Sequence, residues 1–196
     1  MDKNRVLIGE RVSLVASEPK RDAPLVSRWS HNGEYMRMLD ADPIRLWSAE
    51  SSQKWLEDES ELEHPSMILF MIQENESESL IGFVDLSGIN LREKDCMIGI
   101  GLGEPQYWGQ GYGTEAMQLL LEYGFTMLDL HRLSLNVFDY NQRAIRSYHK
   151  AGFQVEGRLR EALNRDGCRW DMLYMGILRD EWEVVRASGG ETGGAK

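Results

Sequence analysis

The chain has 196 residues, 42% of them hydrophobic and 28% charged, and its formal net charge is −10. That length supports one domain, and the composition excludes wholesale disorder and a fibrous repeat. The negative charge disfavours nucleic acid and anionic membranes as partners and favours cationic ones, although net charge more often serves solubility alone.

The first half of the sequence alternates short strands with helices. Val12 and Leu14 fall on one face of a predicted strand, because side chains alternate along a strand. Trp55 and Leu56 fall on the apolar side of a predicted helix whose other residues are largely acidic. The strands expected here span residues 11–16 and 67–73, the helices span 22–32 and 51–63, and a polar turn occupies 74–79.

The second half continues this mixture and ends in a hairpin whose turn contains Asp166 and Gly167. Strands are expected at 80–89, 96–102 and 133–137, helices at 114–127 and 141–150, and hairpin strands at 153–163 and 169–178. The glycine-rich end of the chain has no side chains with which to build a core. We therefore expect one domain over residues 1–186 and a disordered tail over 187–196.

Acidic residues are concentrated between positions 50 and 79, where nine Asp or Glu residues accompany one basic residue, Lys54. One interpretation of this run is an acidic wall that attracts a cationic molecule. The other, which is the commoner use of such runs, is a solvated helix face followed by a solvated turn.

The segment from residue 98 to residue 116 is the most informative. A predicted strand ends in alternating glycines at positions 99, 101 and 103, and the loop 109–113, GQGYG, then runs into a long helix. Glycines let several backbone N–H groups converge on one anion, and a helix N-terminus adds partial positive charge. The spacing matches neither the dinucleotide-binding nor the Walker A pattern. The segment indicates a backbone cradle for a phosphorylated cofactor, with a purely structural glycine turn as the alternative.

A second motif lies downstream, where Asn141, Ala144, Tyr148, Gly152 and Phe153 follow the pattern NxxAxxxYxxxGF. Together the two motifs resemble the GCN5-related N-acetyltransferases (GNAT), in the branch that includes ribosomal-protein N-terminal acetyltransferases and spermidine acetyltransferases. The resemblance spans roughly residues 11–182 and is strongest over 80–178. In that family the cofactor loop reads Arg/Gln-x-x-Gly-x-Gly/Ala.

The loop in this chain departs from that family pattern at its first position, where Trp108 replaces Arg or Gln. The backbone donors that follow do not depend on this side chain. The resemblance implies an α/β (α+β) GNAT fold with one central, mostly antiparallel mixed sheet flanked by helices. It also implies that the sheet is splayed between the cofactor strand and the next strand, which leaves room for the pantetheine arm beside the close-packing glycines of the cofactor strand.

Acetyl-CoA is the acetyl donor that the resemblance implies. The backbone groups expected to grip its diphosphate belong to Gly109, Gln110, Gly111, Tyr112, Gly113 and Thr114. A backbone N–H among Ile100, Gly101 and Leu102 is expected to polarise the thioester carbonyl. Asn141 resembles the asparagine that hydrogen-bonds the pantetheine arm, and it is also a candidate helix N-cap.

Tyr148 matches the family's general acid, which protonates the leaving thiolate, although without the family a buried core tyrosine would be the commoner interpretation. A carboxylate is expected to take the proton of the acceptor amine. The candidates are Asp85, Glu104, Glu34 and Asp40, with Asp85 first because it aligns with an acidic position of spermidine acetyltransferases, while Glu104 lies at the mouth of the phosphate loop. Carboxylates that are exposed are usually only solvated.

The acceptor is expected to be a primary amine, either a polyamine or a protein N-terminal amine, and the acidic run favours a cationic polyamine or basic peptide. In the polyamine branch the first two helices carry binding carboxylates, which agrees with Glu57, Asp58, Glu59 and Glu61. Trp29, Trp47 and Trp55 line an acceptor pocket in one interpretation and are packing residues in the commoner one. The alternative functions are an aminoglycoside-type acetyltransferase and a non-catalytic acyl-CoA-binding sensor or interaction module.

Cys96 and Cys168 have no metal-ligand spacing, so no metal is expected, and so few cysteines are typical of a reducing, cytoplasmic interior. The longest hydrophobic run covers only residues 67–72, far short of a bilayer span, and the N-terminus has no leader pattern. We expect neither a membrane nor a nucleic acid as partner. A homo-oligomer is left open, because members of the family include monomers, dimers and rings.

Overall fold

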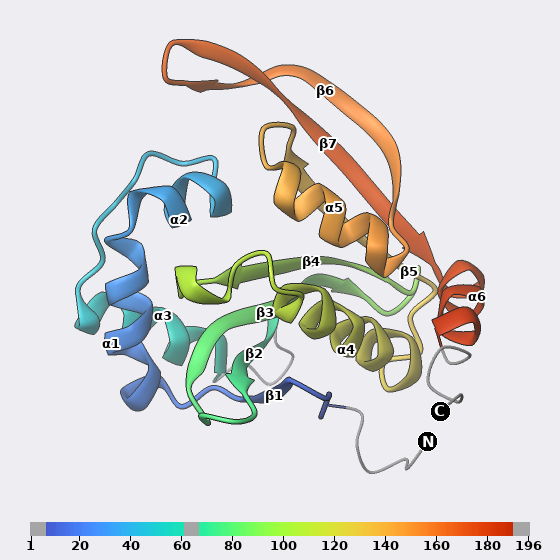
Figure 1. Cartoon of the computed structure of the whole chain (residues 1–196), viewed down its shortest axis with the longest axis horizontal. Helices are drawn as coiled ribbons and strands as arrows, with labels where there is room; N and C mark the ends of the chain where they lie inside the picture. Colours follow the sequence, from blue (N-terminus) through green and yellow to red (C-terminus); the bar gives the residue numbers. More distant parts are fainter. Residues whose placement is uncertain (1–6, 61–66, 190–196) are drawn as a thin grey trace.

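The structure, a computed structural model, describes residues 7–60 and 67–189, with the backbone alone at 58–60 and 188–189. One seven-stranded sheet runs through the molecule in the order β1-β2-β3-β4-β5-β7-β6 (Figure 1). The strands are β1 Val12–Ala16, β2 Met67–Glu74, β3 Leu80–Asn90, β4 Asp95–Leu102, β5 Arg132–Phe138, β6 Gln154–Arg165 and β7 Cys168–Leu178. The helices are α1 Pro19–Ser30, α2 Gly33–Leu39, α3 Ala49–Ser60, α4 Tyr112–Thr126, α5 Gln142–Ala151 and α6 Arg179–Gly189, with a short 3₁₀ turn, η1, at Pro105–Tyr107.

Neighbouring strands are antiparallel except for β4 and β5, which are parallel. β4 and β5 pair only where residues 95–97 face residues 132–134, and beyond Met97 the two strands separate. The predicted mixed sheet, mostly antiparallel and splayed at this point, is therefore confirmed. The Gly103 N–H donates to the Ile81 carbonyl at 2.9 Å. Because antiparallel strands alternate between paired and outward-facing residues, the Ile100 and Leu102 amides face away from β3, toward the splay.

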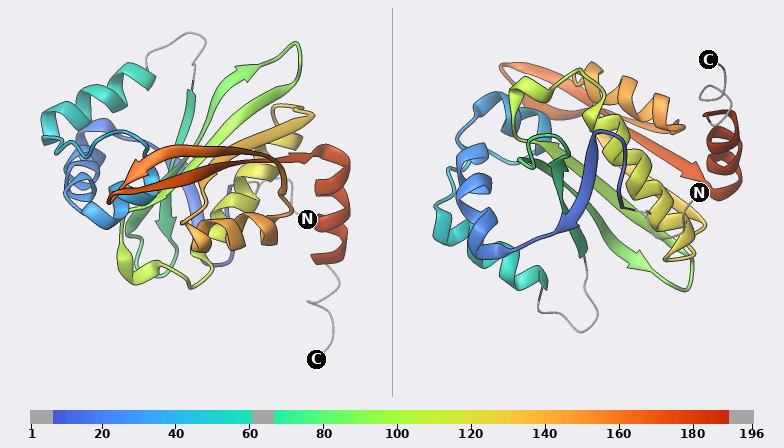
Figure 2. Two further views of the ribbon diagram at one scale, coloured as in Figure 1. Left: turned by 90° about the horizontal axis from the view of Figure 1, so that it is seen from above. Right: turned by 60° about the horizontal axis from the view of Figure 1, so that its bottom comes forward.

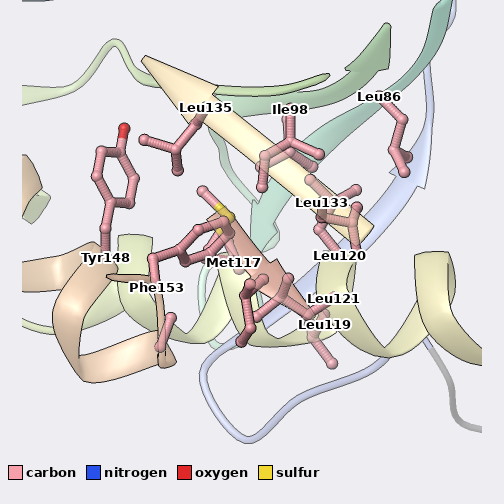
Figure 3. Packing of buried hydrophobic residues seen from close by; sticks show 14 of the residues in the cluster. Leu86, Ile98, Met117, Leu119, Leu120, Leu121, Leu133, Leu135, Tyr148 and Phe153 are labelled. Carbon is pink, nitrogen blue, oxygen red and sulfur yellow. The ribbon is translucent and has the colours of Figure 1, made fainter. Parts of the chain in front are cut away.

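Helices cover both faces of the sheet, as the two views of Figure 2 show. Met71 and Ile72 are consecutive and fully buried, yet they belong to two different hydrophobic clusters because they point to opposite faces. The cluster with Ile72 contains the inner sides of α4 and α5, and Figure 3 shows part of it. The cluster with Met71 packs under α1, α2 and α3. No helix in the described ranges is long and apolar enough to cross a membrane.

Three helical features differ from the sequence-based expectation. α1 begins at Pro19 rather than at residue 22, because proline suits the first turn of a helix. α2 was not predicted, although Asn32 caps it by accepting from the Tyr35 N–H at 3.2 Å. α6 was not predicted either, and it extends through residues 187–189, which the sequence assigned to a tail. Residues 190–196, and residues 61–63 of the predicted helix 51–63, lie outside the described residues.

Candidate active site

Two cavities adjoin β4 where it separates from β5. The aromatic cavity, of about 370 Å³, lies against α1, α2 and α3, and the loop cavity, of about 230 Å³, lies against the glycine loop and α5. The residues that line both cavities are Tyr35, Met38, Leu39, Ile100, Asn141 and Tyr148. Molecules bound in the two cavities would therefore meet beside Ile100 and Tyr148.

Glycine backbone forms one wall of the loop cavity. The sequence-predicted donors that line it are Ile100, Gly101, Leu102, Gly109, Gly111, Gly113, Thr114 and Asn141. Gly109 and Gly111 have φ angles of 73° and 97°, a region that favours glycine, and a Cβ at Gly109 would meet nothing within 4 Å. Gly111 caps α4 without any side-chain hydrogen bond. The first amides of α4 are thus available to an anion.

Basic side chains form the opposite wall of the loop cavity. Arg143, Arg146 and Lys150 line it from α5, and among the described residues that line this cavity none is acidic. Their spacing of three and four residues places them along one side of the helix. An acidic protein thus presents a cationic cavity, which the sequence analysis did not predict. A polyanionic group fits both walls.

Two predicted loop residues, Gln110 and Tyr112, do not line either cavity. The Gln110 side chain donates to the Gln106 carbonyl, and the Tyr112 ring packs edge-on against Tyr107 at 5.0 Å between centroids. Their side chains stabilise the turn that holds the glycines. Their backbone groups remain part of the proposed cradle.

The aromatic cavity has the opposite charge. Asp40 and Asp85 line it, and none of the described residues in its wall is basic. Trp47 and Trp55 line it and contact each other edge-on at 5.7 Å, and Trp55 contacts Phe83 at 6.1 Å. Cations bind well over aromatic faces and beside carboxylates. This cavity suits a cation with an apolar stem.

Asp85 reaches this cavity from β3 because its partner in the β3–β4 register is Gly99. A Cβ at Gly99 would lie 2.4 Å from the Asp85 Oδ1 atom. In the same way, a Cβ at Gly101 would lie 2.5 Å from the Tyr35 hydroxyl oxygen. A Cβ at Gly103 would lie 2.1 Å from the nearest atom of the Trp29 indole. These three glycines therefore let side chains of the chain itself, those of Asp85, Tyr35 and Trp29, pack closely against the backbone of β4 and of the residue that follows it.

Tyr148 projects from α5 into the junction of the two cavities and is 8% exposed. Figure 3 shows its ring at the edge of the cluster that includes Leu135 and Phe153, with its hydroxyl directed away from that cluster. Burial, and secondarily the negative charge of Asp85, raise the pKa of Tyr148 to about 12. The hydroxyl therefore carries its proton throughout the physiological range.

Asn141 and α2 close the junction from the other side. The Asn141 side chain caps α5 by accepting from the Ala144 N–H at 3.2 Å, and it donates to the Met38 carbonyl at 3.4 Å. Tyr140 donates to the Arg37 carbonyl at 2.8 Å. The tip of the β6–β7 hairpin is also joined to α2, by an ion pair between Asp166 and Arg37. α2, which sequence reasoning missed, is thus fixed over both cavities.

The other predicted carboxylates lie elsewhere. Glu104 lines neither cavity; it accepts from Arg28 and from the Trp29 indole N–H at 2.8 Å, and so ties η1 to α1. Glu34 is exposed, and Glu57 lies on α3, where it accepts from Gln53 at 2.7 Å. The side chains of Asp58 and Glu59, and the whole of Glu61, lie outside the described residues. Trp29 is 2% exposed and is a packing residue.

Known acetyltransferases are similar to this chain over most of its length. The family model "Acetyltransferase (GNAT) domain" matches residues 11–154. A spermidine N(1)-acetyltransferase of Escherichia coli K12 is 28% identical over 176 residues, covering 88% of this chain and 89% of the relative. A putative ribosomal N-acetyltransferase of Bacillus subtilis is 29% identical over 105 residues, covering 54% of this chain and 57% of the relative.

A likeness in fold was also found among solved structures. The crystal structure of spermidine N-acetyltransferase from Vibrio cholerae in complex with CoA and spermine superposes with a TM-score of 0.79. The match covers 89% of this chain and 99% of the other, at 24% sequence identity. It establishes that the two chains share a fold.

Proposed function

Since the chain belongs to the GNAT acetyltransferase family and is an acetyl-CoA-dependent N-acetyltransferase, we propose that its acceptor is a cationic amine of the polyamine class. The observation that carries this proposal is the charge of the two cavities. The loop cavity has Arg143, Arg146 and Lys150 in its wall, whereas the aromatic cavity has Asp40 and Asp85. This arrangement sorts a polyanionic donor and a cationic acceptor into two cavities that meet beside Ile100 and Tyr148.

The loop cavity fits acetyl-CoA on three counts: open glycine amides, the first amides of α4 and a cationic wall. Acetyl-CoA supplies the acetyl group as a thioester. In the proposed arrangement the amides of residues 109–114 hold the diphosphate, and Asn141 binds the pantetheine arm. The outward-facing amide of Ile100 donates to the thioester oxygen, where negative charge develops; donors of this kind typically contribute about 2.7–4 kcal/mol to catalysis.

Asp85 is the proposed proton acceptor for the amine, because it lines the aromatic cavity and Glu104 does not. An amine of lysine-like pKa, about 10.4, arrives protonated and must lose a proton before it attacks. That proton passes to Asp85, which holds it during the transfer and releases it to water after the products have formed. The nitrogen then bonds to the acetyl carbon, the carbon–sulfur bond breaks, and Tyr148 protonates the sulfur. The second proton released by the nitrogen restores the Tyr148 hydroxyl, so the protons balance.

The aromatic cavity also supports this acceptor class by its shape and lining. Trp47, Trp55 and Phe83 offer faces and edges to an alkyl chain that carries ammonium groups. Asp40, an exposed residue of the cavity wall, is the proposed partner of a second ammonium group, which a polyamine has and a simple alkylamine lacks. The enzyme's proposed location is the cytoplasm.

A protein N-terminal amine is the second candidate, and the similarity to a putative ribosomal N-acetyltransferase favours it. The experiment that separates the candidates measures thiol release from acetyl-CoA by the purified protein. The acceptors are spermidine, spermine, an aminoglycoside and a basic peptide with a free N-terminal amine. Release with spermidine or spermine at the lowest acceptor concentration supports the proposal. Preference for the peptide or the aminoglycoside overturns it, and release with none of them favours a non-catalytic acyl-CoA-binding module.

A further inference from the structure

Trp108 occupies the first position of the glycine-loop motif and lines the loop cavity. Its indole N–H donates to the carbonyl of Leu102 at 2.7 Å, which fixes the ring against the end of β4. The guanidinium of Arg143 lies over the ring, with its Cζ atom 4.0 Å from the ring centroid. A loop residue and the first turn of α5 are thus joined across the mouth of the cavity by a cation–π contact.

Arg143 is a cation that has no ion-pair partner among the residues that the structure describes. Burial lowers the pKa of Arg143, and the one carboxylate that opposes this effect is Glu34 of α2. Taking a guanidinium partly out of water without pairing it costs free energy, and contact with the indole face offsets only part of that cost.

The Arg143 guanidinium lies beside the glycine-loop amides that are proposed to bind an anion. Arg143 lines the same cavity as Gly109 and Gly111, and Trp108 immediately precedes Gly109. A guanidinium stacked by one face keeps its edge N–H groups free, and these groups suit the paired oxygens of a phosphate. A phosphate in this cavity would supply the anionic partner that the described residues do not give Arg143.

We propose that Arg143 binds a phosphate group of the acyl-CoA donor and that Trp108 is a positioning residue, the platform that holds the guanidinium toward that phosphate. The inference deepens the proposed function by naming a side-chain contact for the donor beyond the backbone cradle. The indole therefore takes the place of a charged or amide side chain at the start of the motif, with the charge itself supplied by α5.

Calorimetric binding of three probes to the purified full chain tests this inference: CoA, 3′-dephospho-CoA and pantetheine. Arg143→Gln should bind CoA about tenfold or more weakly than the wild-type protein, as expected for the loss of a charge-assisted hydrogen bond, and should bind pantetheine unchanged. An equal loss with 3′-dephospho-CoA identifies the diphosphate as the partner, whereas a loss confined to CoA identifies the 3′-phosphate. Arg160→Gln, an exposed arginine on β6 outside the cavity, makes the same charge change and should leave CoA binding intact.

The platform is tested by two substitutions at position 108. Trp108→Phe retains an aromatic face and should keep most of the CoA affinity, whereas Trp108→Leu should reproduce the loss in Arg143→Gln and reduce the salt dependence of binding. If the wild-type protein binds CoA and the Arg143→Gln variant binds it equally well, the inference about Arg143 is overturned, while the assignment of the donor to this cavity stands. Equal weakening for pantetheine and CoA would also overturn it. A wild-type protein that does not bind CoA would instead refute the donor assignment.

Discussion

The negative charge of Asp85 adds to the effect of burial in raising the pKa of Tyr148 to about 12. The two residues come from β3 and α5 and line the aromatic cavity together. Because a neighbouring anion disfavours the phenolate, neutralising Asp85 makes Tyr148 a stronger acid. In the proposed mechanism Asp85 becomes neutral when it takes the proton of the amine. Tyr148 then gives up its own hydroxyl proton more readily, at the stage when the sulfur needs one.

Asp85→Asn should lower the pKa of Tyr148 from about 12, because one of the two causes of the upward shift is removed. The sign follows from charge: the phenolate is the disfavoured form in the wild-type protein and is less disfavoured in the variant. NMR titration of ring-labelled tyrosine, with the resonance assigned by comparison with Tyr148→Phe, measures the shift. An unchanged pKa would show that the two groups are not coupled.

Gly99→Ala should reduce catalysis by displacing Asp85. The new methyl would lie 2.4 Å from the Asp85 Oδ1 atom, so the carboxylate has to move out of its position in the aromatic cavity. Misplacement of a reacting group by an ångström costs up to about 100-fold in rate. We expect kcat to fall about tenfold or more, in steady-state assays with spermidine.

The control for this substitution is Gly157→Ala, also in a strand, where an added Cβ has no neighbour closer than 3.9 Å. It should leave kcat unchanged. A Gly99→Ala variant as active as this control would remove Asp85 from the proposed mechanism.

Asp40→Asn should weaken the binding of polyamines without slowing the chemical step. Asp40 lines the aromatic cavity and is exposed, so the loss of its charge is screened and should raise KM for spermidine by about two- to fivefold with kcat unchanged. Asp42→Asn makes the same change two residues further along, outside the cavity wall, and serves as the control. The role of Asp40 would be contradicted if both variants had a similar KM for spermidine. It would also be contradicted if Asp40→Asn raised KM for a monoamine acceptor as much as KM for spermidine.

Gly103→Ala should destabilise the fold without directly touching either cavity. Its Cβ would lie 2.1 Å from the indole of Trp29, which is 2% exposed and cannot move into solvent. Overpacking of this kind typically costs about 1–3 kcal/mol. Urea unfolding followed by tryptophan fluorescence should report this loss, and an unfolding midpoint equal to that of the wild-type protein would contradict the packing described here.

The strands and the glycine loop could be predicted from the sequence because their signals are local, whereas the antiparallel, splayed arrangement of the sheet followed from the family resemblance. Short runs of apolar residues bounded by turn residues mark the strands, and the glycines of the loop allow backbone conformations that few other residues adopt. α2 was missed because it has only seven residues, too few for a helical period to emerge. Its start was nevertheless marked by Asn32, a good N-cap, ahead of Glu34.

Asp40 and Asp85 were named from the sequence as candidate proton acceptors, but two cavities of opposite charge were not predicted, because the fold assembles each cavity from distant positions. One interpretation of the acidic run at residues 50–79 was a wall for a cation. The carboxylates that line the aromatic cavity are instead those of Asp40, which precedes the run, and Asp85, which follows it. Arg143, Arg146 and Lys150 form a cationic wall only because α5 turns one side toward the glycine loop. A helical spacing of basic residues directly after a motif asparagine was the signal that could have found them.

The proposed mechanism is tested most directly by a paired measurement on Tyr148→Phe, which keeps the buried ring and removes only the hydroxyl. We expect kcat for acetylation of spermidine to fall about 100-fold or more, as for the loss of a general acid, while the Kd of acetyl-CoA stays at the wild-type value. A variant that keeps the wild-type kcat, or one that loses acetyl-CoA binding along with activity, would show that Tyr148 is a packing residue and would contradict the mechanism.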